Sequence, residues 1–576
     1  MNVLGISAYY HDAAACLLRD GRIVAAAAEE RFTRSKHDRR LPKRAIDFCL
    51  EEAGLTIMDL DAVGYYEDPR KKLARQLWSG RLTGQDPLLP EREIRELVGY
   101  EGEIFTFDHH ASHAASAFWF SGFERAAILT IDGVGEWTTT GYGLGEGARI
   151  ERFEEVSFPD SLGLLYSAIT SYLGFEVNEG EYKVMGLAPY GTPRYIDRLA
   201  ELVVREPGAG YTLRPEYFDY VRGGRMYSDA LADLLGVPAR SPGAELTGEH
   251  GDLAASLQHL LEEILLDKVR YLHDRVGGDA LCMAGGVALN CVANGRILRE
   301  GPFRRLFVQP AAGDDGACLG AAALAHARRT GERIPREPLE HMFFGPRYGS
   351  DDILELLAAI GVSAHDYRGR GEALADDVAD RIARGQVIGW FQGKMEFGPR
   401  ALGARSILAD PRDPGMRDRL NRLVKMREAF RPFAPSVLAE RAAEVLELDH
   451  PSPFMLETCR VKDAARFPAV AHVDGSARPQ TVDGRVAPRF AALLEAFLRK
   501  TGCPMVLNTS FNMRGEPIVC TPRDAVRTLL AAEMDALVIE DFIVERSDVP
   551  DGLLETIERW SPPDPQTPTS LVYAFL

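Results

Sequence analysis

The chain has 576 residues, too many for one ordinary hydrophobic core, so we expect two domains. Its composition, with 46% hydrophobic and 26% charged residues, is typical of a globular protein. The formal net charge of −18 argues against a general nucleic-acid or anionic-membrane surface, because contacts with many phosphates need a basic face.

The first 30 residues predict three strands. "NVLGISA", "AAACLL" and "IVAAAAEE" are apolar runs, separated by the polar stretch "YYHD" and by a hairpin turn at Asp20-Gly21. A similar phrase begins at residue 126, "AAILTIDGVGEWTTTGYGLGEGARIERFEE", with its turn at Asp132-Gly133. Two such units predict an internally duplicated α/β domain that binds a ligand between its halves.

Between these units lies "DHHASHAASAFWF". His109 and His113 are four residues apart, so on a helix both rings leave the same face, whereas His110 pairs less well. Spacing alone leaves two interpretations open: a pair of metal ligands, or polar residues at a capped helix start. Two imidazoles need further ligands, and Asp132 and Asp314 at predicted strand ends are the candidates, although each is equally well explained as a turn former or N-cap.

Other residues of the first half have two interpretations each. His11 is a candidate general base or a hairpin histidine bonded to backbone. Lys36 and Lys183 could contact phosphate or carbonyl oxygens, or be solvated. The pair Gly285-Gly286, between an apolar strand and a helix, suits a nucleotide or phosphate but is equally consistent with a plain tight turn.

A polar stretch rich in Pro and Gly, residues 328–350, predicts a domain boundary that gives domains 1–345 and 346–576. Beyond it a helix–strand alternation runs through "DDILELLAAIG", "QVIGWFQG", "MVLNTSFN" and "ALVIEDFIVE", so the second domain is also expected to be α/β.

The second domain contains the most basic part of the chain. Residues 394–431 hold ten basic and five acidic residues, which indicates a polyanion pocket or a solvated basic face. Arg478 lies in an irregular stretch, and Asn508 and Ser510 end an apolar strand, where open α/β sheets bind ligands. No Walker A motif is present in the sequence.

In combination, these motifs closely resemble the O-carbamoyltransferases of the nodulation-factor, cephem and aminoglycoside type. The resemblance runs along essentially the whole chain, in the order "GISAYYHDAA", "AEERFTRSKHD", "HHASHAASAF", "DGVGE", "EYKVMGLAPYG", "GGVALN", "DDGACLGAA", "MEFGPRALGARSILADPR", "REAFRPFAPSV" and "LNTSFN". It implies an N-terminal actin-like, duplicated ribonuclease-H-like domain similar to the tRNA threonylcarbamoyl transferase subunit. It also implies a C-terminal α/β domain similar to threonylcarbamoyl-adenylate synthase.

The resemblance further implies ATP-dependent carbamoyl transfer in two stages. Carbamoyl phosphate and ATP with Mg²⁺ would give carbamoyl adenylate in the C-terminal domain, and a hydroxyl of a sugar or secondary metabolite would take the carbamoyl group in the N-terminal domain. Residues implied for the first stage are Arg400, Lys425, Arg431, Arg478, Asn508 and Ser510. Implied ligands of a metal, normally iron although another divalent ion would fit, are His109, His113, Asp132 and Asp314.

His11 matches a residue at the acceptor site, as base or orienter. Implied nucleotide contacts are Lys36, Lys183, Gly285, Gly286 and Asn290. The expected partners are small molecules, without nucleic acid or membrane, and a homodimer is expected only on general grounds. We expect a cytoplasmic protein. The sequence has no stretch of 18 uninterrupted apolar residues and no signal peptide pattern, and its eight cysteines are scattered without a CxxC pair.

Two other functions would account for some of the same sequence features. Threonylcarbamoyl transfer to tRNA would keep both domains, but the net charge of −18 and the full-length resemblance weigh against it. An actin-fold sugar kinase would leave "MEFGPRALGARS" and "LNTSFN" unexplained.

Overall fold

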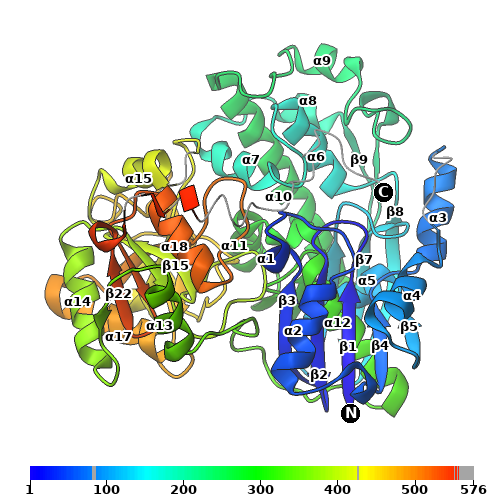
Figure 1. Cartoon of the computed structure of the whole chain (residues 1–576). Helices are drawn as coiled ribbons and strands as arrows, with labels where there is room; N and C mark the ends of the chain where they lie inside the picture. The colour runs from blue at the N-terminus through cyan, green and yellow to red at the C-terminus, as the bar shows by residue number, and fades with distance from the viewer. Residues whose placement is uncertain (81–85, 425–426, 551, 554, 557–576) are drawn as a thin grey trace. The chain divides into compact units, whose positions relative to one another are not determined.

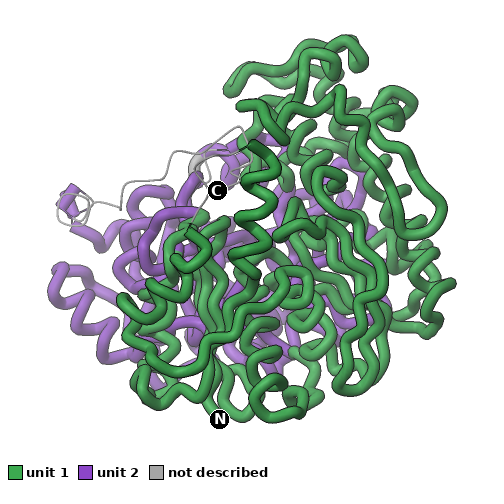
Figure 2. Tube along the Cα trace, turned by 90° about the vertical axis from the view of Figure 1, so that its right-hand side faces the viewer, with its two compact units in different colours: residues 1–29, 37–339, 568–576 green, residues 30–36, 340–567 purple. Residues whose placement is uncertain are grey.

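The computed structural model describes residues 1–80, 86–424, 427–550, 552–553 and 555–556 (Figure 1). Its contacts divide these residues into two compact units (Figure 2). Unit 1 comprises residues 1–29 and 37–339, and unit 2 comprises residues 30–36 together with the described residues after 339. In the described ranges no helix is long and apolar enough to span a membrane.

Unit 1 begins with a five-stranded sheet in the order β3-β2-β1-β4-β5. The neighbours β1/β2 and β2/β3 are antiparallel, whereas β1/β4 and β4/β5 are parallel. Asp20 and Gly21 both have positive φ, 50° and 75°, as the predicted two-residue hairpin requires. The strands are β1 (Asn2–Ser7), β2 (Ala14–Arg19), β3 (Arg22–Ala28), β4 (Ala62–Tyr65) and β5 (Ile104–Thr106).

A second sheet of unit 1 repeats this topology. Its order is β12-β11-β6-β7-β8, with β6/β7 and β7/β8 antiparallel and β6/β11 and β11/β12 parallel. In both sheets the first strand is central, the second and third extend to one side, and the fourth and fifth extend to the other. The predicted duplication is therefore confirmed. The strands are β6 (Arg125–Ile131), β7 (Thr138–Glu146), β8 (Arg149–Ser157), β11 (Ala280–Ala284) and β12 (Arg305–Val308).

The helices that follow the fifth strands exchange sheets. Helix α5 (His109–Phe118) follows β5 but packs on β6 and β11, and α12 (Asp314–Thr330) follows β12 but packs on β1, β2 and β4. The two helices also pack on each other. Glycine makes this possible: a Cβ at Gly320 of α12 would lie 1.8 Å from the carbonyl oxygen of Ser112 in α5. This close packing brings the first residues of the two helices together.

Unit 1 contains further elements. Strands β9 (Val203–Arg205) and β10 (Tyr211–Leu213) form a separate ribbon. The other α-helices of more than four residues are α2 (Lys43–Ala53), α3 (Pro69–Trp78), α4 (Leu89–Glu93), α6 (Leu162–Tyr172), α7 (Glu181–Leu187), α8 (Ile196–Ala200), α9 (Asp229–Leu235), α10 (Gly248–Val276) and α11 (Cys291–Glu300).

Unit 2 is built on a mixed eight-stranded sheet in the order β13-β22-β21-β14-β15-β20-β16-β19, as expected for a second α/β domain. Helices α14 and α17 pack together on it, and α18 packs on β14 and β21. The strands are β13 (His365–Asp366), β14 (Ile388–Phe391), β15 (Arg405–Ala409), β16 (Ala434–Leu438), β19 (Gln480–Val482), β20 (Met505–Ser510), β21 (Ala536–Ile539) and β22 (Phe542–Glu545). The main helices are α13 (Ser350–Ala359), α14 (Gly371–Ala383), α17 (Pro488–Thr501) and α18 (Pro522–Ala531).

The short segment Glu30–Lys36 belongs to unit 2, although the chain on either side of it belongs to unit 1. Phe32 packs against an apolar cluster that includes Met395 and Ile518. Arg34 donates hydrogen bonds of 2.7 Å to the carbonyl oxygens of Pro517 and Ile518. Lys36, predicted to contact the nucleotide, is therefore attached to unit 2.

We expect Gly320→Ala to weaken unit 1, because its Cβ would overlap the Ser112 carbonyl of α5. Overpacking of this kind costs about 3 kcal/mol, which should lower the urea midpoint of unfolding. Gly248→Ala is the matched control, since a Cβ at this first residue of α10 meets nothing within 4 Å. Equal midpoints for the two variants would contradict the proposed packing.

Candidate metal centre and anion-binding residues

Two histidines face each other in the first turns of α5. The side chain of Asp108 caps the helix by accepting a hydrogen bond from the Ala111 amide, and His109 is the first helical residue. The four-residue spacing places the Nε2 atoms of His109 and His113 3.1 Å apart. The helix start is thus capped, as one interpretation predicted, but by Asp108, which leaves both imidazoles available for another role.

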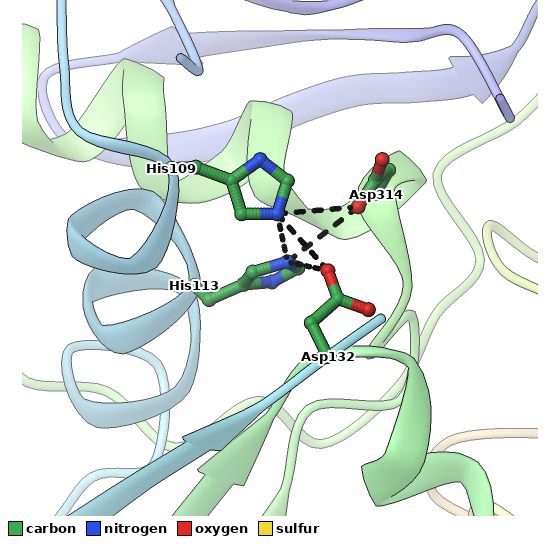
Figure 3. A group of neighbouring side chains, drawn as sticks. All are labelled: His109, His113, Asp132 and Asp314. Atoms are coloured by element: carbon green, nitrogen blue, oxygen red, sulfur yellow. Dashed lines mark hydrogen bonds and ion pairs between the residues drawn. The ribbon is translucent and has the colours of Figure 1, made fainter. Parts of the chain in front are cut away.

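Asp132 and Asp314 complete a four-residue cluster (Figure 3). Asp132 follows β6, and its Oδ2 lies 3.0 Å from His109 Nε2 and 3.4 Å from His113 Nε2. Asp314 is the first residue of α12, and its Oδ1 lies 3.5 and 3.6 Å from the same nitrogens. One atom from each side chain therefore lies within 4.8 Å of the other three, as a single ion requires.

The cluster is buried, and hydrogen bonds alone do not balance the negative charge of its carboxylates. Asp314 is 1% exposed, and neither of its carboxylate oxygens has a hydrogen-bond partner in the described part of the chain. A buried carboxylate without such partners is costly unless a positive charge faces it. Two imidazole nitrogens and two carboxylate oxygens suit Fe²⁺, Zn²⁺ or Mn²⁺, so the donor set fits a divalent metal without selecting one.

The carboxylates also control protonation of the histidines. Burial by itself would lower the pKa of His109, but the negative charges of Asp314 and Asp132 outweigh it and raise this pKa to about 9. The pKa of His113 is raised by the same two carboxylates, against the effect of burial. Protons therefore occupy the cluster at neutral pH when no metal does.

A second layer of hydrogen bonds fixes the candidate ligands. Asp132 Oδ1 accepts from the amides of Gly133, at 2.8 Å, and Gly286, at 3.0 Å. Gly285 has a φ of 93°, and a Cβ there would lie 2.2 Å from the Ile131 carbonyl oxygen. Glu136 Oε1 accepts from the main-chain amide of His109 at 2.9 Å. The sequence reasoning did not identify Glu136, although it lies in the quoted motif "DGVGE".

His11 joins this site through a chain of polar contacts. Its Nε2 lies 3.8 Å from Asp314 Oδ2, and its Nδ1 lies 2.8 Å from Asp12 Oδ2. The other oxygen of Asp12 lies 2.6 Å from His37 Nδ1, and His37 Nε2 lies 3.1 Å from Glu179 Oε1. The "YHD" and "KHD" motifs supply Asp12 and His37, which the sequence reasoning did not single out.

The other candidate residues of the N-terminal half make contacts with nearby residues. His110 Nδ1 bonds Thr130 Oγ1 at 2.7 Å, and burial together with the neighbouring histidines lowers its pKa well below the usual value. It lies outside the four-residue cluster. Asn290 accepts from the Ala293 amide and so caps α11. Lys183, on α7, has its Nζ 6.0 Å from the centre of the Phe175 ring.

In unit 2, several predicted anion-binding residues lie around one buried amide network. Asn508 Nδ2, on β20, donates to Ser436 Oγ at 2.9 Å and lies 3.2 Å from Gln480 Oε1 and 3.4 Å from the carbonyl oxygen of Ala401. Arg400 precedes Ala401, and Arg478 lies two residues before Gln480. Arg400 and Arg478 thus lie one and two residues along the chain from residues that contact Asn508.

The remaining residues of this set are less tightly joined to that network. Ser510 is two residues after Asn508 on the same strand face, and its Oγ lies 2.6 Å from Asn512 Oδ1. Arg431 lies 3.7 Å from Glu428. Lys425 lies outside the described residues. Arg405, which belongs to the same basic stretch, is fully buried and donates to the carbonyl oxygens of Gln392, Ala404, Pro346 and Gly393, so its role is structural.

Comparison with known proteins identifies the family. Residues 2–77 and 97–323 match the family described as carbamoyltransferase N-terminus, and residues 379–546 match carbamoyltransferase C-terminus. The chain therefore belongs to the carbamoyltransferase family, and the resemblance predicted from its motifs is confirmed.

Several relatives match along most of their length. The chain is 44% identical to an uncharacterized protein of Synechocystis, over 97% of this chain and 98% of that protein. It is 41% identical to nodulation protein NolNO of Sinorhizobium fredii, over 93% and 79%. It is 29% identical to the 3′-hydroxymethylcephem-O-carbamoyltransferase of Streptomyces clavuligerus, over 92% and 96%. Among solved structures, component A of (R)-2-hydroxyglutaryl-CoA dehydratase from Acidaminococcus fermentans aligns at 15% identity and a TM-score of 0.31, over 57% of this chain and 98% of that one.

Removing both imidazoles should empty the metal site. We expect the double variant His109→Ala/His113→Ala to lose at least nine-tenths of its bound transition metal, since two carboxylates alone bind such ions weakly. Elemental analysis of the purified protein measures this. His110→Ala, in the same helix turn, is the control and should keep its metal; unchanged metal in the double variant would exclude this site.

Metal binding should release protons. Because the pKa of His109 is raised to about 9, its ring carries a proton at pH 7 and must lose it to become a ligand, and the pKa of His113 is shifted in the same direction. We expect apparent Zn²⁺ affinity to rise with pH up to about 9, by up to about tenfold per pH unit for each proton released. Calorimetric titration at pH 7 in two buffers of different ionisation enthalpy counts these protons. If no protons are released, the rings are neutral before the metal binds.

Proposed function

We propose that the protein transfers a carbamoyl group to a hydroxyl of a small molecule in two steps, with carbamoyl adenylate as the intermediate. The observation that supports this best is the presence of two chemically different clusters in one carbamoyltransferase chain. Unit 1 has a buried four-ligand site with His11 beside it, and unit 2 has arginines around a buried amide network. One cluster suits acyl transfer and the other suits phosphate chemistry.

The first step is assigned to unit 2. Water cleaves carbamoyl phosphate to carbamate and phosphate, the carbamate oxygen attacks the α-phosphorus of ATP, and the bond to pyrophosphate breaks. All reacting groups are anionic, so positive charge must offset their repulsion. The guanidinium Nε of Arg478 is buried without a hydrogen-bond partner in the described chain, as a donor kept for a ligand would be. We assign Arg400, Arg478, Asn508 and Ser510 to substrate oxygens, with Lys425 and Arg431 as further cations and Mg²⁺ bound with ATP.

The second step is assigned to unit 1. The acceptor hydroxyl attacks the carbonyl carbon of carbamoyl adenylate, the bond to the AMP oxygen breaks, and His11 takes the hydroxyl proton. Asp12 engages Nδ1 of His11 and so leaves Nε2 for this proton. A divalent metal at the four-ligand site, iron on the family resemblance, would polarise the carbonyl group and orient it. By the same resemblance, Lys183, Gly285, Gly286 and Asn290 of unit 1 would contact the nucleotide.

The charge around His11 sets a condition for this role. Burial alone would lower the pKa of His11, but Asp314, Asp12 and Asp132 raise it to about 10, so the ring is protonated at neutral pH in the metal-free protein. A base must be neutral before it reacts. A cation bound to Asp132 and Asp314 cancels the charge that raises this pKa, so base function requires a loaded site.

Carbamoyl phosphate-dependent exchange of labelled pyrophosphate into ATP, measured without acceptor, tests the first step alone. We expect Arg478→Ala and Ser510→Ala to lower this exchange at least about 100-fold, because each removes a donor to developing negative charge. His11→Asn should keep the exchange and lose carbamoyl transfer. Arg485→Ala, an arginine whose side chain is 86% exposed, is the control and should behave as the wild type. Loss of exchange in His11→Asn would overturn the division between the two units.

A further inference from the structure

The turn between β1 and β2, which carries His11, is joined to a second turn of unit 1. The main-chain amide of Tyr9 donates to the carbonyl oxygen of Arg39 at 2.7 Å. The main-chain amide of Ala13 donates to the carbonyl oxygen of Asp38 at 2.8 Å. These two bonds lie on either side of His11 in the sequence, so the backbone of its turn is anchored without help from side chains.

A row of five side chains adds a second connection between the same turns. Asp12 lies between two rings, with its Oδ2 2.8 Å from His11 Nδ1 and its Oδ1 2.6 Å from His37 Nδ1. The other nitrogen of His37, Nε2, lies 3.1 Å from Glu179 Oε1. Glu179 Oε2 in turn accepts a hydrogen bond of 3.0 Å from the hydroxyl of Tyr182 on α7. Every link is of hydrogen-bond length, so the row runs unbroken from the proposed base to α7.

The chemistry of these contacts determines which atoms donate. Carboxylate oxygens only accept, so both nitrogens of His37 must carry hydrogen to bond Asp12 and Glu179. Burial alone would raise the pKa of Asp12, but the His37 and His11 rings lower it well below its usual value, which keeps Asp12 an anion. His11 therefore donates to Asp12 from Nδ1, and its Nε2 faces the four-residue cluster, 3.8 Å from Asp314 Oδ2.

The backbone is unusual at three places along this row. The φ angle is 52° at Asp12, 55° at His37 and 70° at Asn178, which precedes Glu179. Residues other than glycine rarely adopt this left-handed region, although Asp, Asn and His do so more often than the rest. Such conformations persist where the surrounding structure holds them, and they gather at functional sites. Their occurrence along one row of contacts indicates a role beyond packing.

An ion pair that only stabilises the turn explains these contacts less completely. The main chain already anchors the turn on both sides of His11. A stabilising ion pair would also need only one ring against Asp12, whereas Asp12 uses one oxygen for each of two rings. The hydrogen bond at one nitrogen of an imidazole determines which nitrogen carries the proton and how the ring is turned. The row therefore has the arrangement in which a third group orients a base through a carboxylate.

We propose that His37 is a positioning residue for carbamoyl transfer. It holds Asp12 by one oxygen, so that the other oxygen keeps the His11 ring protonated at Nδ1 and turned with Nε2 toward the reacting groups. Glu179 and Tyr182 fix the far side of His37. The inference rests on the proposed function, which supplies the role of His11. His37 itself takes no part in bond making or breaking.

The test observes the His11 ring directly. The ring ¹³Cδ2 chemical shift of labelled histidines in Zn²⁺-loaded protein distinguishes the Nδ1–H form, the Nε2–H form and the imidazolium, and His11→Asn identifies the His11 signal by its loss. We expect the Nδ1–H form in the wild type. His37→Gly should lower the ratio of Nδ1–H to Nε2–H forms at least about tenfold, the effect of losing one hydrogen bond to a charged group. His37→Asn should keep the wild-type signal, because its amide nitrogen can replace Nδ1 as the donor to Asp12.

The two substitutions are matched in backbone preference. Glycine and asparagine both tolerate the φ of 55° at position 37, so a difference between them reports the side-chain donor. His273→Ala, which removes a ring that is 33% exposed on α10, is the control and should leave the His11 signal unchanged. Carbamoyl phosphate-dependent pyrophosphate exchange shows that each variant is folded.

Two results would overturn this inference and leave the proposed function standing. One is a His11 signal in His37→Gly that equals that of the wild type. The other is an equal loss of the Nδ1–H form in His37→Gly and His37→Asn. An imidazolium signal from His11 in the Zn²⁺-loaded wild type, or absence of pyrophosphate exchange in the wild type, would instead overturn the proposed function, and this inference with it.

Discussion

Unit 1 is organised around two buried carboxylates that face two imidazoles. Asp132 and Asp314 come from the second sheet and from α12, and His109 and His113 come from α5, so no single element could form the cluster. Asp314 lies at a helix N-terminus, where the helix dipole favours a negative charge. The facing imidazoles, which balance this charge as cations or as metal ligands, depend on the close approach of α5 and α12. The site is therefore a consequence of how the duplicated halves pack.

Strand and turn patterns predicted much of unit 1, because alternating apolar runs and Asp-Gly turns are local signals. The four-residue spacing likewise predicted that His109 and His113 share a helix face. Local patterns could not predict that α5 and α12 exchange sheets, since this depends on backbone contacts such as Gly320 against Ser112. Composition also could not separate Arg405, which binds carbonyl groups in the core, from the arginines that the proposed mechanism assigns to substrates.

The two units suit different chemistry for a physical reason. In the proposed mechanism, adenylate formation would bring several anions together and need fixed positive charge, for which unit 2 has arginines in an otherwise acidic chain. The proposed transfer step would need a neutral base and a polarised carbonyl group, which unit 1 would supply only with a cation held by its carboxylates. Placing a histidine base beside two carboxylates would be unfavourable without that cation, because it would stay protonated. The proposed metal binding and base function are thus linked by charge.

The measurement that tests this account most directly is pyrophosphate exchange and carbamoyl transfer in parallel in the variant Asp314→Asn, with and without added metal. Asp314 is buried in unit 1 and belongs to the four-ligand cluster. The account predicts that carbamoyl phosphate-dependent exchange continues within twofold of the wild type, whereas transfer falls at least about 100-fold. Loss of both activities together in a folded variant, or transfer that persists without metal, would contradict it.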